Sequence, residues 1–191
     1  MRYPAVAGAF YSASKEGLEK EIKACFSKGA GLPKFGNKRS LLAVVAPHAG
    51  YVYSGWVAAF SYSKIAENYK EPPTFVIVGP NHTGTGSGVS ISKEDWENPL
   101  GVVKNDYVLG EAIRENSKFI DFDEVAHRDE HSVEVQLPFL QFLYKEFKFV
   151  PICMMMQDLE TAEDVASAVF NAANKTKKEV VLVASSDFTH Y

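Results

Sequence analysis

Metal-capable side chains follow three short apolar stretches of this chain. His48 lies in the segment APHAGY after the first stretch, His82 lies in GPNHTG after the second, and Asp187 and His190 lie in SSDFTH after the third. Two imidazoles and one carboxylate form a known ligand set for non-haem Fe(II), and they also suit Zn²⁺ or Mn²⁺. The pattern therefore predicts a divalent-metal site made by His48, His82 and Asp187, with His190 beside it.

Restricted turns hold the two early histidines. Pro47 directly precedes His48, Pro80 comes two residues before His82, and a glycine follows each histidine two residues later. Proline and glycine favour tight turns that fix the direction of a side chain, which suits a metal ligand. A lone histidine at a strand end is usually structural, but structural histidines have no reason to recur after separate strands.

Short apolar runs rich in β-branched residues predict the strands that position these side chains. The four runs are Leu41–Ala46, Thr74–Val78, Phe147–Met154 and Val180–Ala184. The carboxyl ends of parallel strands meet at one edge of an open sheet, so the residues after three of these runs should face one another. Pro151 removes one hydrogen-bond donor from the third run, so we expect that strand to lie at an edge or to be bulged.

Segments with helical spacing of apolar residues lie between the strands. They follow Ser14 and Asp158, run from about Ser54 to Ala66 and from about Asp106 to Asn116, and begin near Ser132 with Pro138 close to the start or at a kink. Strands that alternate with helices predict an α/β fold, with a mainly parallel sheet covered by helices on both faces. We expect one domain, residues 1–191, and we expect the natural domain to continue because Tyr191 directly follows a site loop.

Composition and charge narrow the range of partners. The 191 residues are 46% hydrophobic and carry a formal net charge of −4, with Lys and Arg scattered along the chain. We therefore expect neither a nucleic acid nor a membrane as partner. The first residues, MRYPAVAGAFYSAS, lack the features of a secretory signal, so we expect a cytoplasmic protein. Cys25 and Cys153 are best interpreted as buried reduced thiols.

The segment DEHSVE, residues 129–134, offers a further candidate for chemistry. His131 falls at the expected start of a helix, which lowers the pKa of an imidazole, and beside carboxylates, which raise it, so it could act as an acid or base. Alternatively, the segment is a helix cap in which Ser132 is the N-cap residue, while Asp129 and Glu130 complement the helix dipole. Spacing alone leaves both interpretations open.

Residues beside the two early histidines are candidates for contacts to a substrate. Tyr51 and Tyr53 follow APHAG directly, and Asn81 precedes His82. Aromatic rings combined with a few polar groups are typical of ligand pockets. We therefore expect Tyr51, Tyr53 and Asn81 to line the substrate side of the site.

Two other segments near the site are weaker candidates. The loop TGTGSG, residues 83–88, could hold an anion with its amides, but it matches neither the dinucleotide fingerprint nor the P-loop, which favours a flexible loop. Ser185 and Ser186 lack the sequence of a nucleophile elbow. We interpret them as strand-end residues that support the site.

Five motifs occur in order along the chain: AGAFY (Ala7–Tyr11), APHAGYVYSG (Ala46–Gly55), GPNH (Gly79–His82), DEHSVEVQLP (Asp129–Pro138) and SSDFTHY (Ser185–Tyr191). Together they resemble the Memo family, whose microbial members are also called AmmeMemoRadiSam system protein B. The resemblance spans essentially the whole chain. It implies a LigB-like fold similar to that of the class III extradiol dioxygenases, with a metal site at the strand ends.

The same resemblance implies ligands and a metal. His48 and His82 match two histidine ligands of the family, for which iron and copper are both considered. We expect iron first, with copper or zinc as alternatives. A cysteine later in the family's sequence is the third ligand, and neither Cys25 nor Cys153 corresponds to it. 

The remaining motif residues match other family positions around the pocket. The resemblance places Asp187, His190 and His131 along its lining, where we expect them to be catalytic.

The leading hypothesis is a metal-dependent redox protein with dioxygenase-like activity, in which His131 or His190 transfers protons. One alternative is a binding module that holds a peptide or a small ligand in the strand-end crevice without turnover. Another is a metal-assisted hydrolase. The sequence leaves the substrate and the oligomeric state open.

Overall fold

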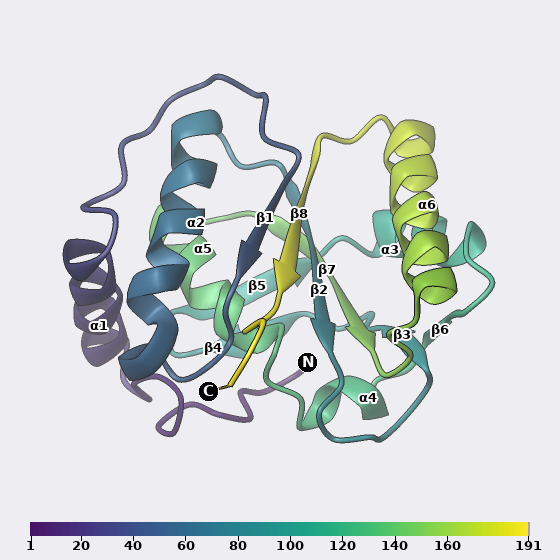
Figure 1. The fold of residues 1–191 in the computed structure, drawn as a ribbon, viewed down its shortest axis with the longest axis horizontal. Helices are drawn as coiled ribbons and strands as arrows, with labels where there is room; N and C mark the ends of the chain where they lie inside the picture. Colours follow the sequence, from purple (N-terminus) through teal and green to yellow (C-terminus); the bar gives the residue numbers. More distant parts are fainter. Residues whose placement is uncertain (191) are drawn as a thin grey trace.

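Parallel strands form the centre of an eight-stranded mixed sheet in the computed structural model, which describes residues 1–190. The central order is β1-β8-β2-β7-β3-β6, and β5 pairs with both β4 and β7. The strands are β1 (Ala43–Ala46), β2 (Thr74–Pro80), β3 (Val89–Ile91), β4 (Trp96–Asn98), β5 (Gly101–Asn105), β6 (Ile120–Phe122), β7 (Lys148–Met154) and β8 (Val180–Ser185). Strands β1, β8, β2 and β7 are mutually parallel and point toward the same end of the molecule (Figure 1).

Helices cover both faces of this sheet, as the sequence predicted. The helices are α1 (Lys15–Lys28), α2 (Trp56–Asn68), α3 (Tyr107–Glu115), α4 (Val125–Arg128), α5 (Leu137–Leu143) and α6 (Leu159–Thr176). Helices α1, α2 and α5 pack together on one side, and α3 and α6 pack together on the other (Figure 1). Within residues 1–190 no helix combines the length and apolar character that crossing a membrane requires.

Burial follows the alternation of side chains along the strands. In β8, Val181 and Val183 are fully buried on one face, whereas Leu182 and Ala184 on the other face are half-buried. Strand β7 is buried from its second residue onward. These patterns explain why short, β-branched runs are strands here, because each buries apolar surface on at least one face of the sheet.

Local capping fixes where two of the helices begin. The Ser14 side chain accepts a hydrogen bond from the Gly17 amide at the start of α1, and the Asp158 side chain accepts one from the Thr161 amide at the start of α6. Both caps satisfy amides that have no partner within the helix.

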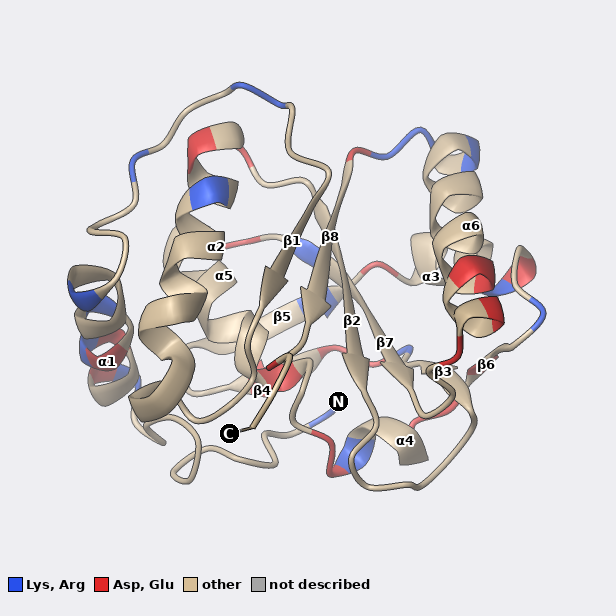
Figure 2. Cartoon of the chain, in the orientation of Figure 1, with Lys and Arg blue, Asp and Glu red and all other residues tan. Residues whose placement is uncertain are grey.

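Figure 2 shows that Lys and Arg are spread over α1, α2, α4, α6 and several loops.

The strand containing Pro151 was expected to lie at an edge or to be bulged, and both expectations are wrong, because its register with β2 is unbroken. Strand β7 lies inside the sheet, where Pro151 is in register with Ile77 of β2. On its other side, β5 pairs only with Lys148 and Phe149, and β3 pairs only from Ile152 onward. The break between these two partners falls at Pro151, so the absence of an amide hydrogen costs no ladder bond there.

The single helix expected from Ser132 onward is also wrong in detail. Helix α4 ends before this segment, a 3₁₀ turn covers Glu134–Gln136, and α5 begins only at Leu137. Pro138 lies in the first turn of α5, as one of the two expected placements had it, because a missing amide is tolerated there. Ser132 does not cap a helix, since its hydroxyl donates to the Pro80 carbonyl instead.

A buried ion pair ties the start of the chain to the DEHSVE segment. The Arg2 guanidinium pairs with the Glu134 carboxylate, and it also donates to the carbonyls of His127 and Glu130. Glu134 in turn accepts hydrogen bonds from the Tyr11 hydroxyl and from two amides of the N-terminal segment. Both charges are therefore satisfied, although each side chain is almost completely buried.

We predict that Arg2→Met lowers the free energy of unfolding by about 3–5 kcal/mol, because it leaves the Glu134 charge buried without its partner. Arg39→Met is the matched control, since Arg39 pairs with Glu179 at the surface, where both side chains are more than 40% exposed. The control should lose less than about 1 kcal/mol. Urea denaturation followed by circular dichroism measures both values, and equal losses would contradict the structural importance of Arg2.

Candidate metal centre

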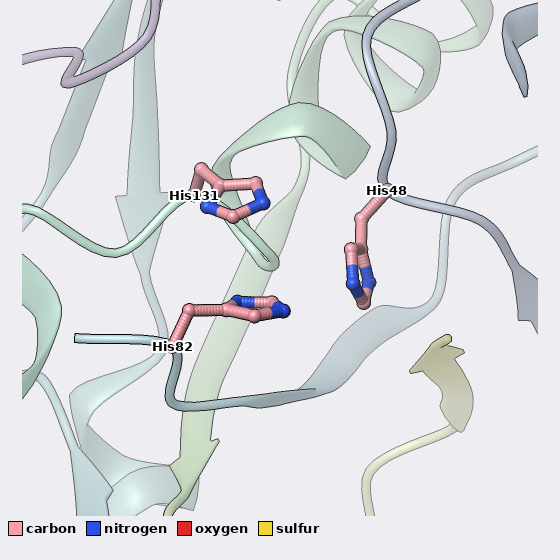
Figure 3. A group of neighbouring side chains, drawn as sticks. All are labelled: His48, His82 and His131. Atoms are coloured by element: carbon pink, nitrogen blue, oxygen red, sulfur yellow. The ribbon is translucent and has the colours of Figure 1, made fainter. Parts of the chain in front are cut away.

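Three histidine rings meet beyond the carboxyl ends of the parallel strands. His48 follows β1, His82 follows β2, and His131 lies in the segment between α4 and α5. Each offers one ring nitrogen, and the three nitrogens lie within 4.8 Å of one another. Figure 3 shows the rings directed toward a common point from three separate segments.

His48 is the buried member of the cluster. Its side chain is 4% exposed, and its Nδ1 lies 2.9 Å from Ser185 Oγ at the end of β8. Burial lowers the pKa of His48 to about 4, against the opposing effect of the Asp187 carboxylate, and the nearby His82 and His131 lower it further. The ring is therefore neutral at pH 7, as a metal ligand must be.

The buried carboxylate of Glu130 holds His82 in position. Its Nδ1 lies 2.9 Å from Oε1 of Glu130, and its backbone amide donates to the other oxygen of the same carboxylate. The His82 side chain is 39% exposed, whereas that of Glu130 is 1% exposed. This arrangement fixes both the position and the tautomer of His82, because a carboxylate can only accept, and it leaves Nε2 free.

The Glu130 carboxylate stays ionised despite its burial. Burial alone would raise its pKa, but hydrogen bonds from the His82 ring and from the amides of Ser132 and His82 outweigh burial and hold the pKa at about 2. The amides of His131 and Ser132 both donate to Oε1 at 2.8 Å. Glu130 therefore supplies a fixed negative charge next to the imidazoles of His82 and His131.

His131 completes the cluster and lies partly under the N-terminal segment. Its ring stacks on His82 with 4.6 Å between the centroids, and the Phe10 ring lies 4.6 Å away on another side. Burial lowers the pKa of His131, while the Glu130 carboxylate partly opposes this change. His131 therefore favours the neutral form, in which one ring nitrogen can bind a metal.

Asp187 lies next to the cluster but outside the group of three nitrogens. Its Oδ1 accepts hydrogen bonds from the amides of His48 and Ala49, and its Oδ2 lies 3.8 Å from His48 Nε2. Burial raises the pKa of Asp187, but these amides and the adjacent His48 outweigh burial and lower it. The exposed His190 ring lies 3.0 Å from the same Oδ2. The structure thus brings Asp187 and His190 to the site, and their roles stay predictions.

The three residues expected to contact a substrate have different surroundings in the structure. Tyr51 is 3% exposed, and its hydroxyl donates to the Val135 carbonyl, so it is part of the core. Tyr53 is 76% exposed. Asn81 organises the following loop, because its amide oxygen accepts from the amides of Thr83 and Gly84. Of these three residues, Tyr53 is the one with a largely exposed side chain that a ligand could contact.

Protein acceptors occupy four of the six backbone amides of the TGTGSG loop. Asn81 occupies the amides of Thr83 and Gly84, the Thr83 hydroxyl accepts from the Thr85 amide, and the Asp123 carboxylate accepts from the Ser87 amide. Amides that already have protein partners have no remaining hydrogen to donate to an anion. These bonds favour a loop over an anion cradle, and the expected flexibility of the loop stays a prediction.

Sequence reasoning missed Glu130 as the partner of a ring and did not place His131 among the nitrogens that converge. The available signal was the adjacency of an acidic residue and a histidine in DEHSVE. That adjacency predicted an acid–base group or a dipole charge, whereas Glu130 in fact reaches across to the loop after β2. A contact between residues 48 positions apart leaves no periodic trace in a sequence.

The donor set fits a divalent transition metal. All three rings can offer a neutral nitrogen, and the Nδ1 atoms of His48 and His82 already have partners in Ser185 and Glu130. Metal-binding histidines in proteins are oriented in this way by a second group on the other nitrogen. Negative charge from Glu130 and Asp187 at the site would offset the charge of a cation.

A mainly parallel α/β sheet with a histidine cluster at its strand ends defines the class of protein, and it is consistent with the LigB-like fold. The Memo-like protein family matches residues 2–191. A MEMO1 family protein of Methanosarcina barkeri is 48% identical over 192 residues, which cover 100% of this chain and 68% of that protein. A relative in Methanothermobacter thermautotrophicus is 48% identical over 195 residues, covering 100% of this chain and 70% of that protein. The chain therefore belongs to the Memo-like family.

We predict that the metal-free protein loses stability as the pH falls from 6.5 toward 4. Burial lowers the pKa values of His48 and His127 to about 4 from an ordinary value of 6.5, so in this range the unfolded chain takes up protons that the folded protein does not. Only well above pH 6.5 are both states neutral, and there this effect vanishes. His48→Gln should make the dependence shallower without abolishing it, because His127 keeps its share.

Chemical denaturation at pH 7.5, 6.5 and 5.5 measures this dependence. The range excludes Glu130, whose contribution is lost only as the pH falls from about 4.5 toward its folded pKa of about 2. If the stability of His48→Gln depended on pH as steeply as that of the wild type, folding would not lower the pKa of His48.

Proposed function

We propose that this protein binds one divalent transition-metal ion through His48, His82 and His131, and that the ion serves redox chemistry of the dioxygenase type, with iron as the first candidate. The observation that carries the proposal is the convergence of three ring nitrogens within 4.8 Å beyond the ends of parallel strands. Buried partners already orient two of these rings. Open parallel sheets bind their ligands at this edge.

Asp187 is the alternative third ligand. With His48 and His82 it would form the two-histidine, one-carboxylate set that holds non-haem Fe(II) with open positions. Its Oδ2 lies 3.8 Å from His48 Nε2, which is close enough for a shared ion after a small side-chain movement. The two ligand sets share His48 and His82, and they differ in whether His131 or Asp187 completes them.

When bound, the ion would supply electron transfer or Lewis-acid chemistry to a substrate at the open side of the site. The residues of the chain would hold and move protons there. His190 is 75% exposed, and its Nε2 lies 3.0 Å from Asp187 Oδ2, so this pair can pass a proton between solvent and the site. Phe10, packed against His131, would restrict water on one side.

A metal-assisted hydrolase is the second candidate, and the composition of the cluster favours it. Three neutral imidazoles are the ligand set of one type of catalytic zinc site, which keeps a position open for water. In this alternative the same three histidines would hold zinc, and the Asp187–His190 pair would accept a proton from a water molecule at the site. The fold and the ligands are shared by both candidates, so only the metal and the reaction separate them.

We predict that replacing His48, His82 or His131 by Ala reduces affinity for Fe(II), Zn(II) and Cu(II) at least tenfold, because each removes one of three protein ligands. Cys153→Ser should leave affinity unchanged, since Cys153 is buried within β7 and lies outside the cluster. Calorimetric titration of each ion, with Fe(II) under anaerobic conditions, gives the affinities. If His131→Ala kept wild-type affinity and Asp187→Asn lost it, the alternative ligand set of His48, His82 and Asp187 would be favoured.

We also predict that the iron-loaded protein consumes oxygen in the presence of a catechol, whereas His82→Ala loaded in the same way does not. An oxygen electrode measures this reaction. Cleavage of ester or phosphoester test substrates by the zinc-loaded protein, without oxygen uptake by the iron form, would favour the hydrolase. Saturable peptide binding that survives chelation, with neither reaction, would instead indicate a binding module and overturn the proposed redox function.

A further inference from the structure

We propose that Ser185 and Gln136 are positioning residues that hold His48 in a single tautomer, with the proton on Nδ1 and the lone pair of Nε2 directed at the histidine cluster. The tautomer follows from hydrogen bonds of the protein alone. Its consequence for metal affinity rests on the proposed function.

The Ser185 hydroxyl has three partners and only one hydrogen. Its Oγ lies 2.7 Å from the Ser132 carbonyl, 2.8 Å from Gln136 Nε2 and 2.9 Å from His48 Nδ1. A carbonyl oxygen can only accept a hydrogen bond, so the single hydrogen of Ser185 goes to Ser132. Both lone pairs of Oγ are then left to accept from Gln136 and from His48.

The orientation of the Gln136 amide is fixed independently. Its Nε2 also lies 3.0 Å from the Pro47 carbonyl, which requires a donor, and its Oε1 accepts from the Tyr62 hydroxyl at 2.5 Å. Reversing the amide would place oxygen against the Pro47 carbonyl and leave Tyr62 facing a donor. Gln136 therefore donates to Ser185 and cannot accept from it.

His48 Nδ1 must then be the donor to Ser185, because no other hydrogen remains between the two atoms. A neutral imidazole with its proton on Nδ1 carries a lone pair on Nε2. The competing acceptor for a proton on Nε2 is Asp187 Oδ2, which lies 3.8 Å away, beyond hydrogen-bond distance. The structure thus offers the proton a close acceptor on one side of the ring and a distant one on the other.

Burial makes this network difficult to replace with water. Ser132, Ser185 and Gln136 are between 0% and 4% exposed. They come from the end of β8 and from the segment before α5, and Tyr62 comes from the middle of α2. The tautomer of His48 is therefore set by the packing of separate elements, which are in place before any ion arrives.

The direct test is the protonation state of the His48 ring in the metal-free protein. Long-range ¹H–¹⁵N correlation spectra of protein with ¹⁵N-labelled histidine, at pH 7.5, distinguish a protonated Nδ1 from a protonated Nε2, and comparison with His48→Gln assigns the ring. We expect a protonated Nδ1 in the wild type. A protonated Nε2, or an even mixture of the two tautomers, would overturn the inference.

Ser185→Ala should shift the His48 proton toward Nε2, because Nδ1 loses its acceptor and Asp187 becomes the nearest one. Ser186→Ala is the matched control: the neighbouring Ser186 hydroxyl accepts from the Phe188 amide and does not bond to His48. Ser185→Thr keeps the hydroxyl and should restore the protonated Nδ1. An unchanged tautomer in folded Ser185→Ala would contradict a positioning role for Ser185.

Gln136→Leu tests the second positioning residue by the same spectrum. Without the amide donor, only the Ser132 carbonyl still directs the Ser185 hydrogen, so we expect the Nε2 tautomer of His48 to appear beside the Nδ1 form. A Gln136→Leu protein that folds and keeps Nδ1 fully protonated would remove Gln136 from the proposal.

Zinc affinity separates this inference from the proposed function. Titration with Zn²⁺ alone should show a roughly 10- to 100-fold loss in Ser185→Ala, no loss in Ser186→Ala and recovery in Ser185→Thr. A wild type with a protonated Nδ1 that binds no metal would refute the proposed function and leave the tautomer assignment intact. A Ser185→Ala protein with a shifted tautomer and full affinity would refute the link between the two.

Discussion

The site depends above all on one buried carboxylate. Glu130 accepts hydrogen bonds from the ring and the backbone of His82 and from the amides of His131 and Ser132, so it joins the loop after β2 to the segment before α5. Without these bonds the ionised group could not stay buried, since an unpaired charge is very costly in the interior. The same bonds keep two histidines next to each other. The hydrogen bonds of Glu130 are thus needed both for folding and for the arrangement of the site.

Further polar contacts, made by Arg2, support this arrangement. Arg2 donates to the Glu130 carbonyl and pairs with Glu134, which ties the beginning of the chain to the segment that carries His131. Phe10 packs on the His131 ring from the same N-terminal region. Two of the motif regions, DEHSVEVQLP and SSDFTHY, therefore contribute buried partners as well as candidate ligands, so a motif can serve to hold the backbone as well as to do chemistry.

The sequence predicted the parallel strands and the convergence of their ends because those features are encoded locally, in short β-branched runs followed by turns. It failed at Pro151 because the missing donor is harmless where two partner strands of β7 leave a gap, which is a property of the assembled sheet. It also missed strands β3 to β6, which are only three to five residues long. Ser185 was expected to support the site, but neither its partner His48 nor the pairing of Glu130 with His82 could be assigned, because each acts through a partner 48 or more residues away.

The strand order has a consequence for how the cluster is assembled during synthesis. Strand β1 carries His48 to the site, yet it lies at the edge of the sheet and pairs only with β8, the last strand within residues 1–190. The backbone of His48 is likewise held by Asp187, 139 residues later. An emerging chain that has not yet released Val180–Ser185 from the ribosome can bring His82 and Glu130 together, but it has no partner strand that would bring His48 to them. Long-range closure of this kind slows folding, so a nascent chain would expose His82 and His131 as an incomplete cluster until Val180–Ser185 emerges.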